Sequence, residues 1–267
     1  MSHRIAPSTA ASALLRRDMA VALSYPVPFL LEFAAAAFAV VTTWFVAKLV
    51  DPQDVPGGYF AFVTLGLALT ALLAGAVGML AGTVRDEQNR GTLEAMVATG
   101  VPPSSLAVGL SAYPMVASAA SGLWYLLVAL LMGARFEMSG LPVAVAAALL
   151  GGCSFAAIGI MGAALTIAIQ RAAGIVGWIV AVLGLAAGEL FPPELMPGWL
   201  QALAKLSPVT WVLVAVRDAL LGGAGIDVGL APLLVLAVMA IVLAAVAVSS
   251  LAQALRYAKA RGTLGGY

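Results

Sequence analysis

Residues 59–94 consist of YFAFVTLGLALTALLAGAVGMLAGTV followed by RDEQNRGTLE. The first part, residues 59–84, carries no charge, whereas half of the last ten residues are charged in a chain whose charged fraction is only 9%. Around 20 consecutive apolar residues are enough for a helix to cross the hydrocarbon core of a bilayer. The stretch therefore predicts a membrane-spanning helix that ends in a charged loop, and this loop is expected to contact something in water.

The rest of the chain has the same apolar character. Hydrophobic residues make up 63% and the mean hydropathy is +1.07, whereas soluble domains are about 45–50% apolar. Short alternating segments of about ten residues, typical of a membrane β-barrel, are not found. We therefore predict one all-α, multi-pass membrane domain over residues 1–267. The net charge of +1 gives no field that would attract nucleic acid.

Six membrane spans are predicted, and the fifth is slightly short at about 25 Å. Their ranges are 29–50, 59–84, 106–133, 141–169, 172–188 and 230–255. Residues 8–25 form an amphipathic pattern that suits the membrane surface, and the break at Tyr25-Pro26 separates it from the first span. Residues 189–229 are apolar but interrupted by prolines, which predicts a re-entrant or interfacial hairpin between spans five and six.

The distribution of lysine and arginine sets the expected orientation. With the N-terminus inside, nine of these residues lie on the cytoplasmic side and four outside, as the positive-inside rule requires. Both termini and the charged loop at 85–94 are then cytoplasmic, and the proline-broken segment faces outward. We expect a multi-pass protein of the cell membrane, plasma or inner.

The charged loop can continue as a short helix with two faces. Leu93, Met96 and Val97 recur at helical spacing, while Glu87 and Arg90 can pair beside them. Such a helix suits docking into a groove on a soluble partner. An interfacial helix that rests on lipid headgroups is the alternative.

Two stretches far apart in sequence resemble ABC-2 type transporter permeases. The first combines Glu87, the run RGTLE at 90–94 and the run ATGVP at 98–102, and it resembles the cytosolic loop of that family. The second resembles the family's re-entrant extracellular segment, and it consists of Gly188, Phe191-Pro192, Met196-Pro197, Trp199, Leu203, Leu206, Ser207-Pro208, Arg217 and Leu221-Gly222. With the six spans and the interfacial helix, the resemblance covers essentially the whole chain.

The resemblance implies roles for both stretches. A coupling helix that docks on a separate ATPase subunit would include Arg85, Asp86, Glu87, Arg90, Gly91, Thr92, Leu93 and Glu94. A re-entrant exit segment would include Glu189, Phe191, Pro192, Pro197, Trp199, Pro208 and Arg217. The family also implies a permease homodimer and the export of a lipid, a lipid-linked glycan or a hydrophobic drug.

The chain itself is expected to bind no cofactor and to carry no catalytic residue. A P-loop needs Gly-Lys-Ser/Thr, and none of Lys48, Lys205 and Lys259 follows a glycine. ATP and Mg²⁺ would therefore be bound by the partner ATPase. No cluster of histidine, cysteine and carboxylate residues predicts a metal site. An ATP-independent secondary transporter, or a membrane anchor that transports nothing, are the alternative functions.

Several intramembrane residues have two interpretations. The pairs Gly78/Gly82 and Gly184/Gly188 have a small-xxx-small spacing that allows close helix packing, either within one subunit or between two. Glu32 and Glu189 are costly in hydrocarbon and can mark function, or they can be solvated at span ends. Arg217 and Asp218 are most simply an exposed pair.

Overall fold

The structure is a computed structural model, and it describes residues 7–50, 57–98, 101–168, 178, 181–182, 184, 187–190, 196–222 and 226–261. Within these residues every regular element is a helix, which confirms the all-α prediction. In chain order they are α1 (Pro7–Ser24), α2 (Pro26–Ala47), α3 (Tyr59–Asn89), α4 (Thr92–Ala98), α5 (Pro103–Leu131), the 3-10 helix η2 (Met138–Gly140), α6 (Leu141–Ala168), α8 (Gly198–Ala204), α9 (Pro208–Leu221) and α10 (Ile226–Arg261).

Five helices are long and apolar enough to cross a membrane, namely α2, α3, α5, α6 and α10. They correspond to the predicted spans one, two, three, four and six. Most of the predicted fifth span, 172–188, lies outside the described residues. The pair α8–α9 passes the same test as one bent element, so the described part of the chain has five or six candidate spans.

Prolines mark where three helices begin. Pro26, Pro103 and Pro208 lie in the first turns of α2, α5 and α9, where a proline loses no helical hydrogen bond because the first N–H groups are unpaired anyway. At α9 the hydroxyl of Ser207 also accepts the N–H of Val209 at 3.2 Å, a normal N-cap. The chain bends by 89° between α8 and α9. This bend fits the proline-broken segment, and its re-entrant placement in a membrane stays a prediction.

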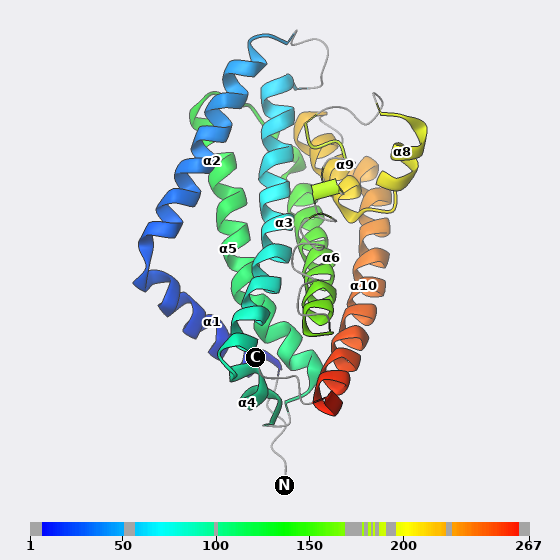
Figure 1. The fold of residues 1–267 in the computed structure, drawn as a ribbon. Coiled ribbons are helices and arrows are strands. Elements are labelled where there is room, and N and C mark those ends of the chain that lie inside the picture. Colours follow the sequence, from blue (N-terminus) through cyan, green and yellow to red (C-terminus); the bar gives the residue numbers. More distant parts are fainter. Residues whose placement is uncertain are drawn as a thin grey trace.

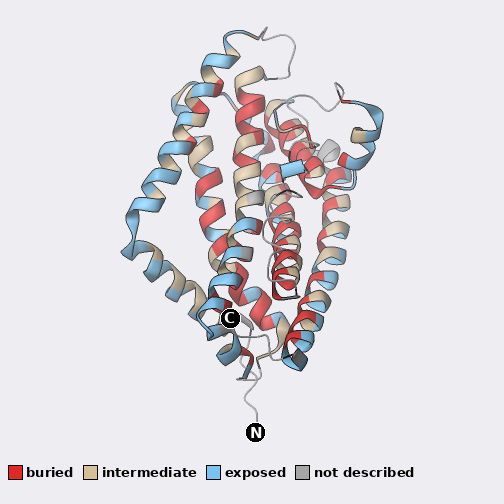
Figure 2. Cartoon of the chain, viewed as in Figure 1, coloured by how far each residue is buried: buried red, intermediate tan, exposed pale blue. Residues whose placement is uncertain are grey.

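Helix α3 is the central element of the bundle. It packs against α5, α6, α9 and α2 (Figure 1), and Leu65, Leu73 and Val77 on it are almost fully buried. Figure 2 shows buried residues along α3, α6 and α9, whereas α2 and α10 present exposed faces. With 31 residues α3 is about 46 Å long, so its last turns reach beyond a hydrocarbon core of about 30 Å.

The two segments singled out by the sequence lie at opposite ends of the bundle. Helices α8 and α9 lie beside the start of α3 at one end, and α4 and the last turns of α10 lie at the other (Figure 1). Helix α1 packs on α5 and runs from the α4 end toward the start of α2. The arrangement agrees with the predicted placement of the charged loop and the proline-broken segment on opposite sides.

Candidate docking surface and intramembrane cavity

The charged loop is a tight turn between two helices. Helix α3 ends at Asn89, where the N–H of Arg90 still bonds to the carbonyl of Asp86 at 3.0 Å. Gly91 then has a φ of 71°, a left-handed conformation that glycine adopts without strain. Helix α4 begins directly at Thr92. The backbone therefore breaks at Gly91, between the end of α3 and the start of α4.

Glu87 is buried at this turn and joins three elements. Its carboxylate accepts a hydrogen bond from Arg17 Nη2 of α1 at 2.6 Å and another from the Thr92 hydroxyl, which also contacts the Glu87 carbonyl at 3.2 Å. The Glu87 side chain is 7% exposed and that of Arg17 is 41% exposed. The expected pairing of Glu87 with Arg90 is wrong, because the carboxylate points toward α1 instead.

Arg17 carries two acidic partners. Its Nε lies 2.8 Å from Asp18 and its Nη2 bonds to Glu87. Burial alone would lower the pKa of the Arg17 guanidinium, but the hydrogen bonds to Asp18 and Glu87 raise it above its ordinary value. Arg17 therefore stays charged, and the surface helix α1 is tied electrostatically to the end of α3. No sequence pattern indicates this pair, because its members are 70 residues apart.

The apolar face of α4 is directed into its own bundle. Val97 is buried and Met96 is partly buried in a core cluster with Leu106 of α5 and Leu255 of α10. Val97 and part of Met96 are therefore used inside the bundle, and docking of the rest of this face into a groove on a partner stays a prediction. The Leu93 side chain lies outside what the structure describes.

The predicted coupling residues that remain exposed at this end are polar or glycine. The exposed predicted coupling residues are Arg85, Asp86, Arg90, Gly91, Thr92 and Glu94. They form the surface of the α3–α4 turn, which we call the turn surface. Because Met96 and Val97 of α4 pack against residues of α5 and α10, the turn surface is held against the bundle at the end of α3.

At the opposite end Arg217 of α9 is buried, with 8% exposure. Its Nη1 bonds to the Gly188 carbonyl at 2.7 Å, and its Nη2 bonds to the carbonyls of Glu189 at 2.9 Å and Phe62 at 3.2 Å. The guanidinium also lies 3.5 Å over the Phe62 ring, a cation–π geometry. The prediction of an exposed Arg217–Asp218 pair is therefore wrong, because the guanidinium is buried and binds backbone carbonyls of two other segments.

The other predicted exit residues have mixed positions. Pro197 and Trp199 are exposed near the start of α8, and Pro208 is buried at the start of α9. Phe191 and Pro192 lie outside the described residues. The structure thus places α8 on the surface and α9 within the core.

The predicted packing glycines of α3 make no close helix contact within the described residues, and their packing between two subunits stays a prediction. Gly78 and Gly82 are exposed, and a Cβ at either would meet no atom of the described residues within 4 Å. Gly188 lies in a turn with a φ of 82°, so it does not continue a helical repeat with Gly184. Close helix contacts occur elsewhere: a Cβ at Gly75 would lie 2.9 Å from Ser118 Oγ.

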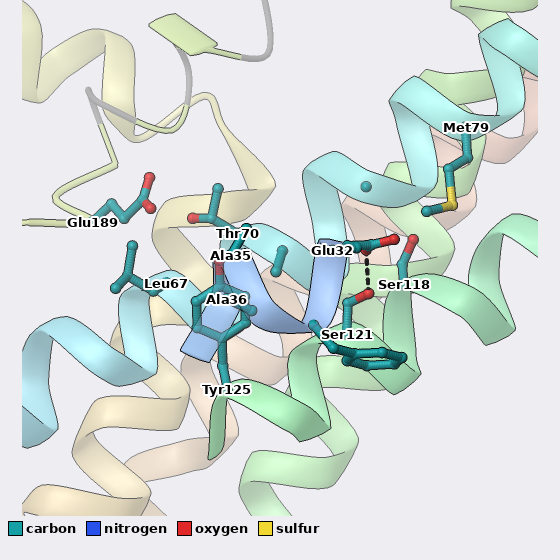
Figure 3. Close-up of a pocket in the computed structure, with 13 residues that line it drawn as sticks. Glu32, Ala35, Ala36, Leu67, Thr70, Met79, Ser118, Ser121, Tyr125 and Glu189 are labelled. Carbon is teal, nitrogen blue, oxygen red and sulfur yellow. Dashed lines mark hydrogen bonds between the residues drawn. The ribbon is translucent and has the colours of Figure 1, made fainter. Parts of the chain in front are cut away.

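An open cavity of about 370 Å³ lies beside the middle of α3. Its walls come from α2, α3, α5 and residue 189, and they contain two carboxylates, several hydroxyls, two aromatic rings and small apolar side chains. The lining residues are Glu32, Phe33, Ala35, Ala36, Leu67, Thr70, Ala71, Gly75, Met79, Ser118, Ser121, Tyr125 and Glu189 (Figure 3). The two acidic residues with open interpretations thus belong to one site.

Contacts inside the cavity fix the position of Glu32. Its carboxylate accepts the Ser121 hydroxyl at 2.5 Å, and Trp124 Nε1 donates to the neighbouring Phe33 carbonyl at 2.9 Å. Figure 3 shows Thr70 between Glu32 and Glu189 in this view. Glu32 is exposed in the second turn of α2 and also makes a specific contact with Ser121 of α5, so its solvation near the end of the span stays a prediction.

The hydroxyl-bearing residues of α5 that line this cavity are not among the site residues predicted from the sequence. Ser118, Ser121 and Tyr125 lie on α5 at spacings of three and four, which places them on one helix face. That spacing was the available signal. Among the residues that the structure describes, no group of three histidine, cysteine or carboxylate side chains could hold a metal ion.

Comparison with known proteins gives one family. A family model described as "ABC-2 type transporter" matches residues 10–221. The match begins within α1 and ends at the last residue of α9, so it includes the turn surface, the cavity and the contacts of Arg217. Comparison with curated proteins gives no match.

Proposed function

The chain belongs to the ABC-2 type transporter family, and we propose that it exports a lipid, a lipid-linked glycan or a hydrophobic drug with energy from ATP. Family membership makes it a membrane-spanning transport subunit of the ABC type. ATP and Mg²⁺ would bind to a separate ATPase subunit docked on the turn surface. The absence of a P-loop lysine in the sequence supports this division of labour.

The observation that carries the proposal is that α3 is one helix that reaches from the cavity wall to the turn surface. Met79 lines the cavity, and Arg85 begins the turn surface six residues later on the same helix, a distance of about 9 Å along the helix axis. A force applied to the turn surface would move the cavity wall directly. Helix α1 would move with it, because Arg17 holds Glu87.

The energetic requirement on such a partner is specific. The ATPase must bind the turn surface differently in its ATP-bound and ATP-free states, since equal binding would shift no equilibrium. The exposed charges Arg90 and Glu94 are the contacts expected to differ. Both charges can be substituted while the contacts of the buried Glu87 with Arg17 and Thr92 are left in place.

Charge reversal tests the docking. The double variant Arg90→Glu/Glu94→Lys should lose the ATP hydrolysis that co-purifies with the tagged chain and should lose ATP-driven transport in vesicles. The matched control is Arg135→Glu/Glu137→Lys, which makes the same exchange at two exposed positions in the α5–α6 connection. Unchanged co-purification in the first variant would contradict the assignment of the turn surface.

We propose further that the permease acts as a homodimer through α3. Gly78 and Gly82 are exposed and open, and small residues at this spacing allow two membrane helices to approach closely. In a Cys153→Ser background, Gly78→Cys should give a disulfide-linked dimer. Leu149→Cys, exposed on α6, is the control that should stay monomeric, and equal cross-linking of both would contradict this interface.

One measurement distinguishes a permease from the first alternative, a non-transporting membrane anchor. A permease should let its cargo stimulate the partner's ATP hydrolysis, whereas an anchor should not. An ATP-independent transporter would need no ATPase at all, and family membership favours the permease over it.

A further inference from the structure

We propose that the cavity beside α3 binds the positively charged head of an amphiphilic organic cation, so that cations with an apolar body are the preferred cargo. This inference rests on the proposed transport function and names the substrate class of its binding site. The evidence is the charge, the hydrogen-bonding groups and the apolar walls of the cavity.

The first argument is the charge of the lining. Glu32 and Glu189 both line the cavity, and none of the described residues that line it is a lysine, arginine or histidine. The nearby Arg217 guanidinium is directed to the carbonyls of Gly188, Glu189 and Phe62. An ionised carboxylate at membrane depth is costly unless it is paired. A cationic ligand would provide that pairing, whereas an anionic ligand would be repelled.

The second argument is a polar group left over inside the site. Ser118 is 0% exposed, and its hydroxyl oxygen has no hydrogen-bond partner in the described part of the chain. Buried hydroxyls normally have a partner, because an unsatisfied one costs free energy. Ser121, one turn further along α5, already uses its hydroxyl on Glu32. Ser118 belongs to the cavity wall and lies close to Gly75 of α3, and a ligand that reached its buried hydroxyl would supply the missing hydrogen-bond partner.

The third argument separates an organic cation from a metal ion. Hard metal ions prefer six or more oxygen ligands, and the described residues offer no group of three ligating side chains. The remaining walls are apolar or aromatic, with Phe33 and Tyr125 among them. Aromatic faces attract organic cations, and apolar walls suit the body of an amphiphile. A volume of about 370 Å³ is also within the usual range for small-molecule sites, about 300–1,000 Å³.

Two probes of nearly the same shape and opposite charge test the inference. The purified full chain, in phosphatidylcholine nanodiscs and without ATPase or ATP, is titrated with tetraphenylphosphonium and with tetraphenylborate, and empty nanodiscs give the baseline. Saturable binding of the cation and weak binding of the anion are expected. Because no ATPase is present, the result is independent of whether the turn surface couples to one.

Charge-neutralising variants locate the site. Glu32→Gln and Glu189→Gln should each weaken cation binding about tenfold or more, since each removes one partner of a close charge pair. Glu32→Asp and Glu189→Asp keep the charge and should retain most of the affinity. Glu137→Gln makes the same change at an exposed position outside the cavity and should bind like the unmodified chain.

Folding is monitored by circular-dichroism melting of each variant. If either glutamine variant melts early, the comparison moves to the aspartate variants and to the ratio of cation to anion affinity in the unmodified chain. Equal affinity for the two probes would overturn the inference. Undiminished cation binding in folded Glu32→Gln and Glu189→Gln would overturn it as well.

Discussion

The two ends of the bundle each use one arginine to hold distant segments together, but in different ways. At the α4 end Arg17 is 41% exposed and binds two carboxylates, those of its neighbour Asp18 and of the buried Glu87. At the α9 end Arg217 is buried, binds three backbone carbonyls and stacks on Phe62. The first contact is an ion pair with one partly exposed member, and the second is part of the core. We infer that the α4 end is built to move and the α9 end to stay in place.

The largest loss of stability is expected from substituting Arg217 at the α9 end. Arg217→Ala leaves the carbonyls of Gly188, Glu189 and Phe62 without their donor in a buried site, which should lower the free energy of unfolding by about 3 kcal/mol or more. Arg217→Lys should recover only part of this, because an ammonium cannot fork between carbonyls or stack on Phe62 in the same way. Thermal unfolding in detergent measures both.

The control for that experiment is Arg135→Ala, an exposed arginine in the α5–α6 connection. It should unfold like the unmodified chain. If Arg217→Ala and Arg135→Ala unfold at the same temperature, the contrast between a fixed and a mobile end fails.

A smaller effect is expected at the α4 end. Arg17→Ala leaves Glu87 buried with only Thr92 as its donor, and it should cost about 1–2 kcal/mol of local stability. Hydrogen exchange of the amides of residues 85–98 should become faster, while amides of α9 should not change. Arg16→Ala, at the exposed neighbouring position, is the matched control, and equal exchange in both variants would argue against the tie between α1 and α3.

The smallest effect comes from salt and needs no substitution. Raising the salt concentration from 0.1 M to 1 M shortens the screening length from about 10 Å to about 3 Å. The half-exposed Arg17–Glu87 pair should weaken by a few tenths of a kcal/mol, which hydrogen exchange of residues 85–98 would detect. Exchange near Arg217 should stay constant, and a parallel rise at both ends would show that salt acts on the whole fold.

Much of this architecture follows from the sequence, because its helices are long apolar runs with clear ends. The charge-free stretch at 59–84 predicts α3, and the prolines at 26, 103 and 208 lie where helices begin. The charged loop also predicts a turn, and Gly91 has the left-handed backbone that such a turn needs.

Contacts between segments were harder to predict. The adjacent Asp218 suggests an exposed pair, yet on α9 Arg217 shares a face with the buried Leu213 and Leu220, at spacings of four and three. Helical periodicity could have shown its burial, but not the carbonyls that it binds. The cavity was likewise out of reach, since Glu32, Ser118 and Glu189 meet only after α2, α5 and residue 189 come together.

The hydrogen bond from Arg217 to the Glu189 carbonyl has a consequence for how mutations can change cargo selectivity. The same residue that α9 holds by its backbone lines the cavity with its side chain. Variants selected for a changed cargo should therefore arise on α9 as well as in the cavity, although α9 contributes no residue to the cavity wall. A laboratory selection with a toxic amphiphilic cation would then recover substitutions around Arg217 that alter selectivity from a distance.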